Sequence, residues 1–243
     1  MQEQLDFFAK NGYLVVFNAL SSQEIRSIND AIDRDLINNR RMWRKANYIG
    51  RNNMNFLLSY PETDVTARPP TLLPIIQAIM GSNLCIDEHS AVIRPPNPDG
   101  MPDCMWHRDG EKVADSPYYC YLLSVIFYLT EVDDTTHTFS VISGTAQSSE
   151  FLPLDAYNLE NAVHLVGPAG TAVLFNPAMF HAFNCRKTVS ERRTIHICCG
   201  RTTQPSMSNY TIFPPRLWKN QDEDTCRYYS RLNPITKLLL EHF

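Results

Sequence analysis

From Leu84 onward the sequence consists of short apolar segments separated by turn residues, and this pattern limits the fold more than any other feature. Eight segments have the length and composition of β-strands, and clusters of Pro, Gly and Asn separate them. The predicted strands cover residues 84–94, 105–109, 118–130, 137–143, 163–166, 171–175, 179–184 and 191–199. Eight short strands favour a double-sheet jelly roll, so we predict a mainly β fold.

The residues before this strand-rich part favour helices. Ser21 and Glu24 have the spacing of a capping box, and apolar residues recur after them at helical intervals. The predicted elements are a short helix that opens at Leu5 and ends at Asn11 and Gly12, a strand over 13–17, a helix after Ser21, an irregular segment over 40–68 and a helix over 72–80. These helices are expected to form a layer on one outer face of the jelly roll.

The length of 243 residues favours a single domain over residues 1–243. No internal repeat or long linker divides it. We expect a helical layer at 1–83, a jelly-roll core at 84–200 and a C-terminal segment at 201–243 that wraps the core.

Composition excludes several classes of protein. Lys and Arg number 22 against 26 Asp and Glu, which argues against a nucleic-acid partner. The longest apolar stretch, 118–130, is well short of the ~20 residues that span a membrane. No secretory signal is visible, and the seven cysteines lack CxxC spacing, which is typical of reduced thiols. We therefore expect a cytoplasmic monomer or small homo-oligomer with no membrane partner.

The sequence WHRDG at 106–110 is the first candidate for chemistry. In a strand, residues i and i+2 face the same side, so His107 and Asp109 can present an imidazole and a carboxylate to one metal ion. His181 follows a later predicted strand and turn. Two imidazoles and one carboxylate form the facial set that binds non-haem Fe(II) and leaves positions open for other ligands.

Arg192 lies eleven residues after His181, on the last predicted strand. A guanidinium inside an apolar barrel is costly unless an anion pairs with it, and a dicarboxylate would do so through two hydrogen bonds. Alternation along the strand sends one of Arg192 and Arg193 inward, and sequence alone leaves both possible. Spacing from His181 favours Arg192.

Together these residues resemble the phytanoyl-CoA dioxygenase (PhyH) family of iron and 2-oxoglutarate dependent oxygenases. The resemblance extends over residues 5 to about 200 and includes FFAKNGYLVV at 7–16, VIFYLT at 125–130 and TFSVISGT at 138–145. It implies a cupin-like double-stranded β-helix that uses Fe(II), 2-oxoglutarate and O₂. The implied site comprises His107, Asp109 and His181 on iron, Arg192 on the distal carboxylate of 2-oxoglutarate, and Phe127 and Ser90 beside this co-substrate.

Two positions depart from the family pattern. Phe183 stands where the family often has Ser, two residues after the distal histidine, and Arg94 replaces the usual Lys before the proline-rich loop. The first change affects hydrogen bonding to the co-substrate, whereas the second keeps the positive charge.

The resemblance implies an enzyme that hydroxylates, desaturates or rearranges a small organic molecule, such as a metabolic or natural-product intermediate, while 2-oxoglutarate becomes succinate and CO₂. Glu88 and Arg94, with the segments 95–104 and 145–162, are the candidate substrate contacts, because loops over a barrel mouth usually carry specificity. A nucleic-acid demethylase would carry a second Arg where this chain has Cys198. A non-catalytic jelly-roll binding module remains the alternative.

The other five histidines are expected in surface or core positions. They are His89, His137, His164, His196 and His242. His196 shares strand parity with Arg192, so it is the one that could face the pocket.

Overall fold

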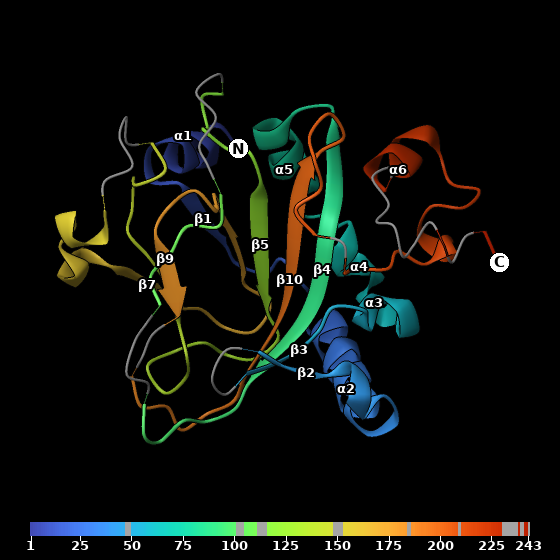
Figure 1. Ribbon diagram of the computed structural model, residues 1–243, viewed down its shortest axis with the longest axis horizontal. Helices are drawn as coiled ribbons and strands as arrows, with labels where there is room; N and C mark the ends of the chain where they lie inside the picture. The colour runs from blue at the N-terminus through green and yellow to red at the C-terminus, as the bar shows by residue number, and fades with distance from the viewer. Residues whose placement is uncertain are drawn as a thin grey trace.

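The computed structural model describes residues 1–46, 50–100, 105–110, 116–147, 153–183, 186–208, 210–229, 238 and 241–242. Two antiparallel sheets form the centre of the molecule (Figure 1). The larger has the order β1-β8-β5-β10-β4-β3-β2, and the smaller has the order β7-β6-β9. This arrangement confirms the predicted mainly β jelly-roll fold.

The strands of the large sheet are β1 (Tyr13–Val16), β2 (Arg44–Ala46), β3 (Gly50–Asn53), β4 (Leu84–Arg94), β5 (Leu123–Tyr128), β8 (Ala172–Phe175) and β10 (Arg192–Arg201). Those of the small sheet are β6 (Phe139–Val141), β7 (Val163–Leu165) and β9 (His181–Phe183). The central strand, β10, pairs with β4 on one side and β5 on the other.

The α-helices are α1 (Gln2–Asn11), α2 (Ser22–Asn38), α3 (Phe56–Ser59), α4 (Asp64–Ala67), α5 (Leu73–Met80) and α6 (Glu223–Tyr228). Short 3-10 turns are η1 (Arg40–Met42), η2 (Pro61–Thr63), η3 (Leu154–Ala156), η4 (Leu159–Asn161) and η5 (Pro215–Leu217). The Ser21–Glu24 capping box opens α2 as predicted. Gly12 ends α1 at φ +80°, where its N–H donates to the Phe8 carbonyl.

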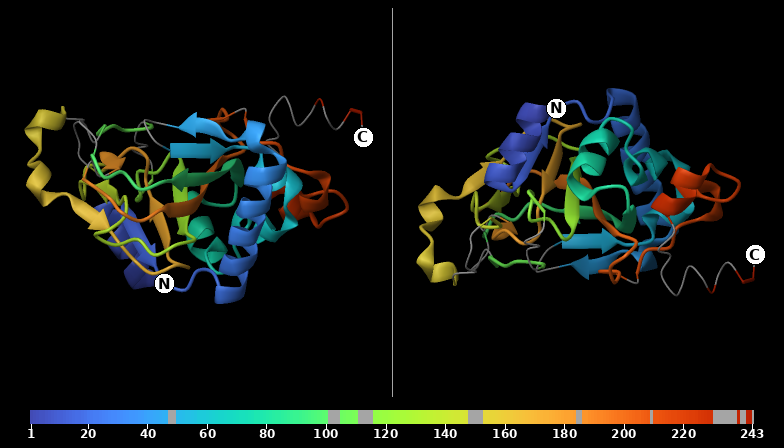
Figure 2. Two further views of the ribbon diagram at one scale, coloured as in Figure 1. Left: turned by 90° about the horizontal axis from the view of Figure 1, so that it is seen from below. Right: turned by 90° about the horizontal axis from the view of Figure 1, so that it is seen from above.

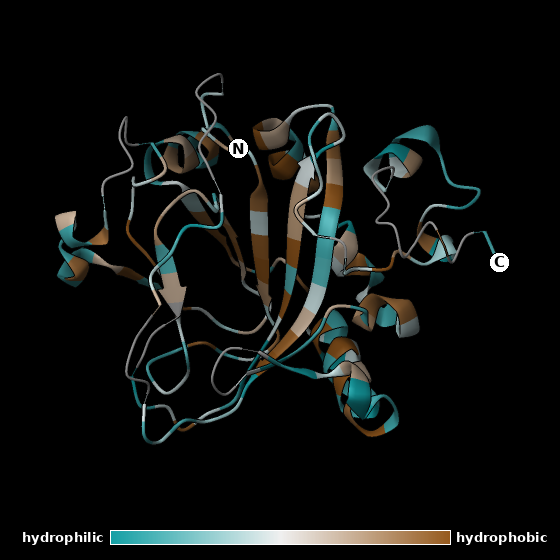
Figure 3. Ribbon diagram, in the orientation of Figure 1, coloured by the Kyte–Doolittle hydropathy of each residue, from teal (hydrophilic) through white to brown (hydrophobic). Residues whose placement is uncertain are grey.

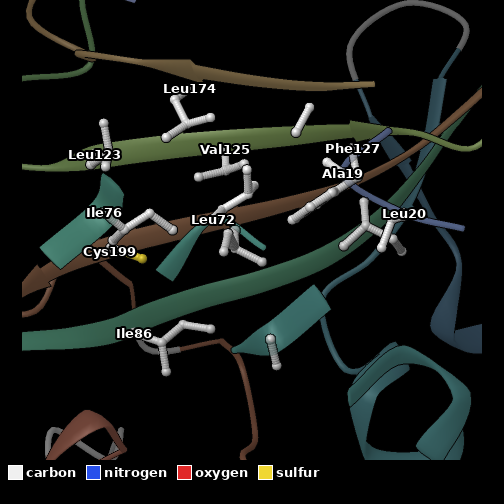
Figure 4. Close-up of a cluster of buried hydrophobic side chains, with 14 of the residues drawn as sticks. Ala19, Leu20, Leu72, Ile76, Ile86, Leu123, Val125, Phe127, Leu174 and Cys199 are labelled. Carbon is white, nitrogen blue, oxygen red and sulfur yellow. The ribbon is translucent and has the colours of Figure 1, made fainter. Parts of the chain in front are cut away.

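The helical layer and the large sheet enclose the larger of two apolar clusters (Figure 4). From the helices come residues such as Phe8, Ile28 and Ile76, and from the sheet come alternate residues of β5 and β10. The members on β5 and β10 are Leu123, Val125, Phe127, Ile195, Ile197 and Cys199. Because strand side chains alternate, the residues between them point to the other face of the sheet.

That other face looks toward the small sheet, and a second apolar cluster fills part of the space between them. Ile126 and Tyr128 of β5 meet Phe139 and Val141 of β6 there. We call this side of the large sheet the inner face. It carries the residues that alternate with the members of the larger, helix-covered cluster along β4, β5 and β10.

The segment 40–68 contains more regular structure than we predicted. Strand β3 pairs with the edge of β4, and β2 pairs with β3, so the large sheet gains two strands. A buried carboxylate explains why this polar segment is ordered. Asp35 of α2 accepts hydrogen bonds from Trp43 Nε1 at 2.8 Å, Asn53 Nδ2 at 2.7 Å and Asn39 Nδ2 at 2.6 Å.

Several predicted strands are shorter than expected, among them β6, which spans Phe139–Val141 of the predicted 137–143, and β9, which spans His181–Phe183 of the predicted 179–184. Strand β5 spans only Leu123–Tyr128 of the predicted 118–130. In 105–109 the structure has an isolated bridge, His107 with His181, instead of a strand. The segment that carries η3 and η4 lies at the opposite end of the molecule from α6 in all views (Figures 1 and 2). In the described part of the chain, no helix is long and apolar enough to cross a membrane.

A substitution at Gly170 probes the close contact between the segment before β8 and the backbone of Leu20, which precedes α2. Its φ is +91°, and an added Cβ would lie 2.8 Å from the Leu20 carbonyl oxygen, which is backbone and cannot yield easily. We expect Gly170→Ala to lower the free energy of unfolding by more than about 1 kcal/mol, measured by denaturant titration. Gly81→Ala is the matched control, since Gly81 has φ +84° but nothing within 4 Å of the added Cβ. If both variants lost the same free energy of unfolding, the cost at Gly170 would come from backbone strain alone and not from the contact with Leu20.

Candidate metal and co-substrate site

The structure brings His107, Asp109 and His181 together as predicted. His107 Nε2 lies 3.2 Å from Asp109 Oδ1, and His181 Nε2 lies 3.2 Å from Asp109 Oδ2. One candidate ligand atom from each residue lies within 4.8 Å of the other two. The three side chains therefore have the chemistry and the proximity to bind one metal ion.

Backbone pairing places these ligands. The His107 N–H donates to the His181 carbonyl at 3.1 Å, and the His181 N–H donates to the His107 carbonyl at 3.0 Å. The Asp109 N–H donates to the Pro177 carbonyl at 2.9 Å. A segment that precedes β5 is thus bound to the start of β9, far away in sequence.

The orientation of both imidazoles follows the same rule. Each Nδ1 faces the carbonyl of the residue two positions earlier, at 2.6 Å for His107 with Met105 and 3.0 Å for His181 with Met179. A ring that donates from Nδ1 keeps a lone pair on Nε2, the atom that faces Asp109. Met105 reaches this position with φ +52°, a left-handed conformation that a side chain disfavours.

Arg108 lies between two of the candidate ligands and holds their segment in place through hydrogen bonds and a contact with an aromatic ring. Its Nη1 donates to the Thr145 carbonyl at 3.0 Å and to the Ala178 carbonyl, and its guanidinium lies 4.0 Å from the centre of the Phe180 ring. Its Nη2 is 3.4 Å from the hydroxyl of Tyr157, in the segment that carries η3 and η4. Sequence reasoning missed this role, because an arginine between two ligands has no distinctive spacing.

The electrostatics of the site favour bound positive charge. Burial opposes ionisation of Asp109, but hydrogen bonds from His107 and His181 outweigh it and hold the pKa of this carboxyl well below its usual range. The hydrogen bond to Asp109 raises the pKa of His107. A divalent ion at this point would be a positively charged partner for the carboxylate.

Arg192, rather than Arg193, faces inward. Arg192 is 2% exposed, and its Nη1 donates to the His137 carbonyl at 3.1 Å. Its buried Nε has no hydrogen-bond partner, and within the described ranges no carboxylate pairs with it. Arg193 instead pairs with Asp33 at 2.8 Å and Glu191 at 2.6 Å. The inward guanidinium is therefore ready for an anion.

Arg94 lies directly opposite Arg192 in the β4–β10 pairing. Burial, followed by the charge of Arg192, lowers the pKa of Arg94 to about 9. Burial also lowers the pKa of Arg192. Two buried guanidiniums side by side destabilise each other, and an anion bound between them would offset this repulsion.

Ser90 and Glu88 also lie on the inner face of β4. Ser90 is four residues before Arg94, and Glu88 is six residues before it. Ile86, Ala91 and Ile93 of β4 belong to the helix-covered cluster, so Ser90 and Arg94 point the other way. Glu88 is opposite Cys198, which is also inward. The structure thus places Ser90, Glu88 and Arg94 on the inner face.

Phe127 was wrongly predicted to lie beside the co-substrate. It is fully buried in the helix-covered cluster, close to Ala19 and Leu20 (Figure 4). The inward residues on either side of it are Ile126 and Tyr128. The hydroxyl of Tyr128 donates to the Leu165 carbonyl at 2.7 Å, and burial raises its pKa to about 12. Strand β5 is apolar on both faces, so no alternation in the sequence reveals its parity.

The remaining histidines differ in position. His89 is fully buried on the outer side of β4, with Nε2 2.9 Å from the Thr66 hydroxyl. His164 contacts Ser140 at 2.7 Å, and His137 contacts Thr188 at 3.3 Å. His196 is inward, between the outward Ile195 and Ile197. Phe183 lies in β9, but its side chain is outside the described residues. Residues 101–104 and 148–152 of the predicted substrate segments 95–104 and 145–162 are also outside the described residues.

A jelly roll that holds two imidazoles and a carboxylate beside an inward arginine has the arrangement of mononuclear non-haem iron oxygenases. The chain belongs to the phytanoyl-CoA dioxygenase (PhyH) family, whose model matches residues 8–194. It is therefore an Fe(II) and 2-oxoglutarate dependent oxygenase, and the predicted Fe(II), 2-oxoglutarate and O₂ are confirmed as its cofactor and co-substrates.

Solved structures share this fold at low sequence identity. HygX from Streptomyces hygroscopicus, with nickel, 2-oxoglutarate and hygromycin B bound, has a TM-score of 0.66 at 17% identity, over 85% of this chain and 89% of that chain. The carbocyclase SnoK from nogalamycin biosynthesis has a TM-score of 0.65 at 16% identity, over 82% of this chain and 83% of that chain. The epimerase SnoN, in complex with Fe³⁺, α-ketoglutarate and nogalamycin RO, has a TM-score of 0.67 at 12% identity, over 84% of this chain and 86% of that chain. No curated protein matches the sequence.

The position of Phe127 can be tested with Phe127→Leu. A change of shape in the helix-covered cluster should lower the free energy of unfolding by up to about 1.5 kcal/mol. The KM for 2-oxoglutarate should stay within about twofold of the original value, because the side chain does not reach the inner face. A rise in this KM of more than tenfold without loss of stability would place Phe127 at the co-substrate instead.

Proposed function

We propose that this protein oxidises a small organic molecule, with His107, Asp109 and His181 as the iron ligands and Arg192 as the anchor of 2-oxoglutarate. The observation that supports it most is the common location of these groups. The three ligand side chains meet at one point, and the buried guanidinium of Arg192 shares the space between the sheets with them.

The residues fit the two groups that the family requires. The donor set of two Nε2 atoms and one carboxylate is suited to Fe(II) and leaves coordination positions for a keto acid and O₂. The unpartnered Nε of Arg192 is suited to a carboxylate. When bound, Fe(II) and 2-oxoglutarate supply the oxidising chemistry, and 2-oxoglutarate is converted to succinate and CO₂.

The protein contributes geometry and exclusion of water. Carbonyls of Met105 and Met179 hold the imidazoles with Nε2 toward the metal position, and Arg108 holds the segment between the ligands. Phe139 and Phe175 lie 5.5 and 5.1 Å from the His181 ring, between ring centres, and shield one side of the site. Arg192 binds and orients the co-substrate, so that its keto acid end reaches the metal.

The substrate class is proposed as a small organic molecule of the kind found in natural-product or intermediary metabolism. HygX and SnoN of similar fold have structures with hygromycin B and nogalamycin RO bound, which supports a small-molecule substrate. The function is tested by incubating the protein with Fe(II), 2-oxoglutarate, O₂ and panels of such molecules. One candidate should accelerate succinate formation and gain one oxygen or lose two hydrogens in step with it.

Replacement of one ligand tests the metal assignment. We expect His181→Ala to lose most bound Fe(II) and all detectable turnover, since two remaining ligands hold the ion weakly. Metal content after anaerobic loading and desalting is the measurement. His164→Ala is the control, because His164 is a histidine of β7 outside the ligand cluster. Full iron content and turnover in His181→Ala would refute the assignment.

A pair of neighbouring arginines tests the co-substrate anchor. Loss of a charge-assisted pair with two hydrogen bonds costs about 2–5 kcal/mol, so Arg192→Ala should raise the KM for 2-oxoglutarate well over tenfold. Arg193→Ala removes the same charge from the outward side and should change this KM little. A reversed order of the two effects would contradict the role of Arg192.

A further inference from the structure

Glu88 is a carboxylate on the inner face whose charge no cation of the described chain balances. It lies in the middle of β4, where a hydrophilic stretch separates two more apolar ends (Figure 3). Its partner on β10 is Cys198, next to a register shift that leaves Asp87 as an extra residue of β4. Bulges of this kind commonly redirect side chains beside active sites.

The position of Glu88 relative to the metal site follows from its electrostatic neighbours. Burial raises the pKa of Glu88, and the carboxylates of Asp109 and Asp87 raise it further, whereas a hydrogen bond from Ser208 lowers it. Asp109 is one of the three candidate metal ligands, so Glu88 lies within electrostatic reach of the metal position.

Cations are concentrated at the other end of the same face. Arg94 is six residues further along β4, which is about 20 Å in an extended strand, and Arg192 is opposite Arg94. Among the ion pairs of the described chain, none includes Glu88. His196 supplies no counter-charge, because burial and the two arginines lower its pKa to about 3. Glu88 is thus available to a positive group from outside the chain.

Several inward residues around Glu88 are polar as well, beside Cys198 and the apolar Ile126. Ser90 precedes Arg94 on the inner face of β4, His196 is paired with Ser90, and Ser124 is paired with Cys198. Ser124 and His196 are partly exposed, so they offer hydrogen-bonding groups to a ligand. A wall of this composition suits a polar molecule better than a hydrocarbon chain.

We propose that Glu88 binds a positively charged nitrogen of the substrate, so that the enzyme acts on polar small molecules that carry an amine. This inference rests on the proposed function, since it takes the cluster of His107, Asp109 and His181 as the site of oxidation. An ammonium group at Glu88 would compensate the buried carboxylate and orient the substrate toward the metal, while Arg192 holds 2-oxoglutarate at the opposite end.

The experiment uses matched compounds on a complex that cannot turn over. The protein is loaded with Ni(II) and 2-oxoglutarate, and dissociation constants are measured by ligand-observed NMR for cyclohexylamine against cyclohexanol and for glucosamine against glucose. We expect each amine to bind at least tenfold more tightly than its neutral counterpart. In Glu88→Gln this preference should fall to within twofold. Glu131→Gln, which neutralises an exposed glutamate, should keep it.

The outcomes separate the two levels of the proposal. If the original protein fails to bind Ni(II) and 2-oxoglutarate, the proposed function is wrong. If it binds both but shows no preference for amines, or if the preference survives in Glu88→Gln, only the role of Glu88 is wrong. The comparison within the original protein requires no variant, so a folding defect of Glu88→Gln cannot obscure the result. Equal binding of alcohol and amine would indicate a neutral hydrogen-bonding role for Glu88.

Discussion

The site depends on two backbone hydrogen bonds between His107 and His181. They join a segment before β5 to the first residue of β9, and they bring both imidazoles to the same carboxylate. Forming such a contact between distant segments costs loop-closure entropy, which the surrounding sheets must offset. The sheets do so because the large one is fixed on its outer side by the helical layer and on its inner side by the small sheet. The sheets then hold the three candidate ligands close together.

The two faces of the large sheet have different roles. Outward residues of β5 and β10 pack against helices in the larger apolar cluster, whereas inward residues include charged and hydrogen-bonding groups beside the smaller apolar cluster. Along the inner face the charge is polarised, with Arg94 and Arg192 at one end and Glu88 at the other. A dianionic co-substrate and a cationic substrate would therefore approach the metal position from opposite ends and would not compete.

Much of this arrangement could be predicted from the sequence, and the failures have physical causes. The capping box at Ser21 and the pair of His107 and Asp109 depend on local spacing, which sequence displays directly, whereas His181 was proposed from its residue type and its place after a later predicted strand. Phe127 was misplaced because β5 is buried on both faces and lacks alternation. The strands β2 and β3 were missed because they are stabilised by the edge of β4, which follows much later in the chain, and by hydrogen bonds to the buried Asp35. Elements and residue pairs that depend on local spacing can be predicted from the sequence, but strands that are stabilised by pairing with another element cannot.

The central claim is that one Fe(II) and one 2-oxoglutarate occupy the inner face between the triad and Arg192. A crystal structure of the protein prepared with both under anaerobic conditions tests it most directly. The account predicts a single metal coordinated by Nε2 of His107, Nε2 of His181 and a carboxylate oxygen of Asp109, with the distal carboxylate of 2-oxoglutarate against the Arg192 guanidinium. Metal bound by other side chains, or 2-oxoglutarate bound with Arg192 uninvolved, would contradict it.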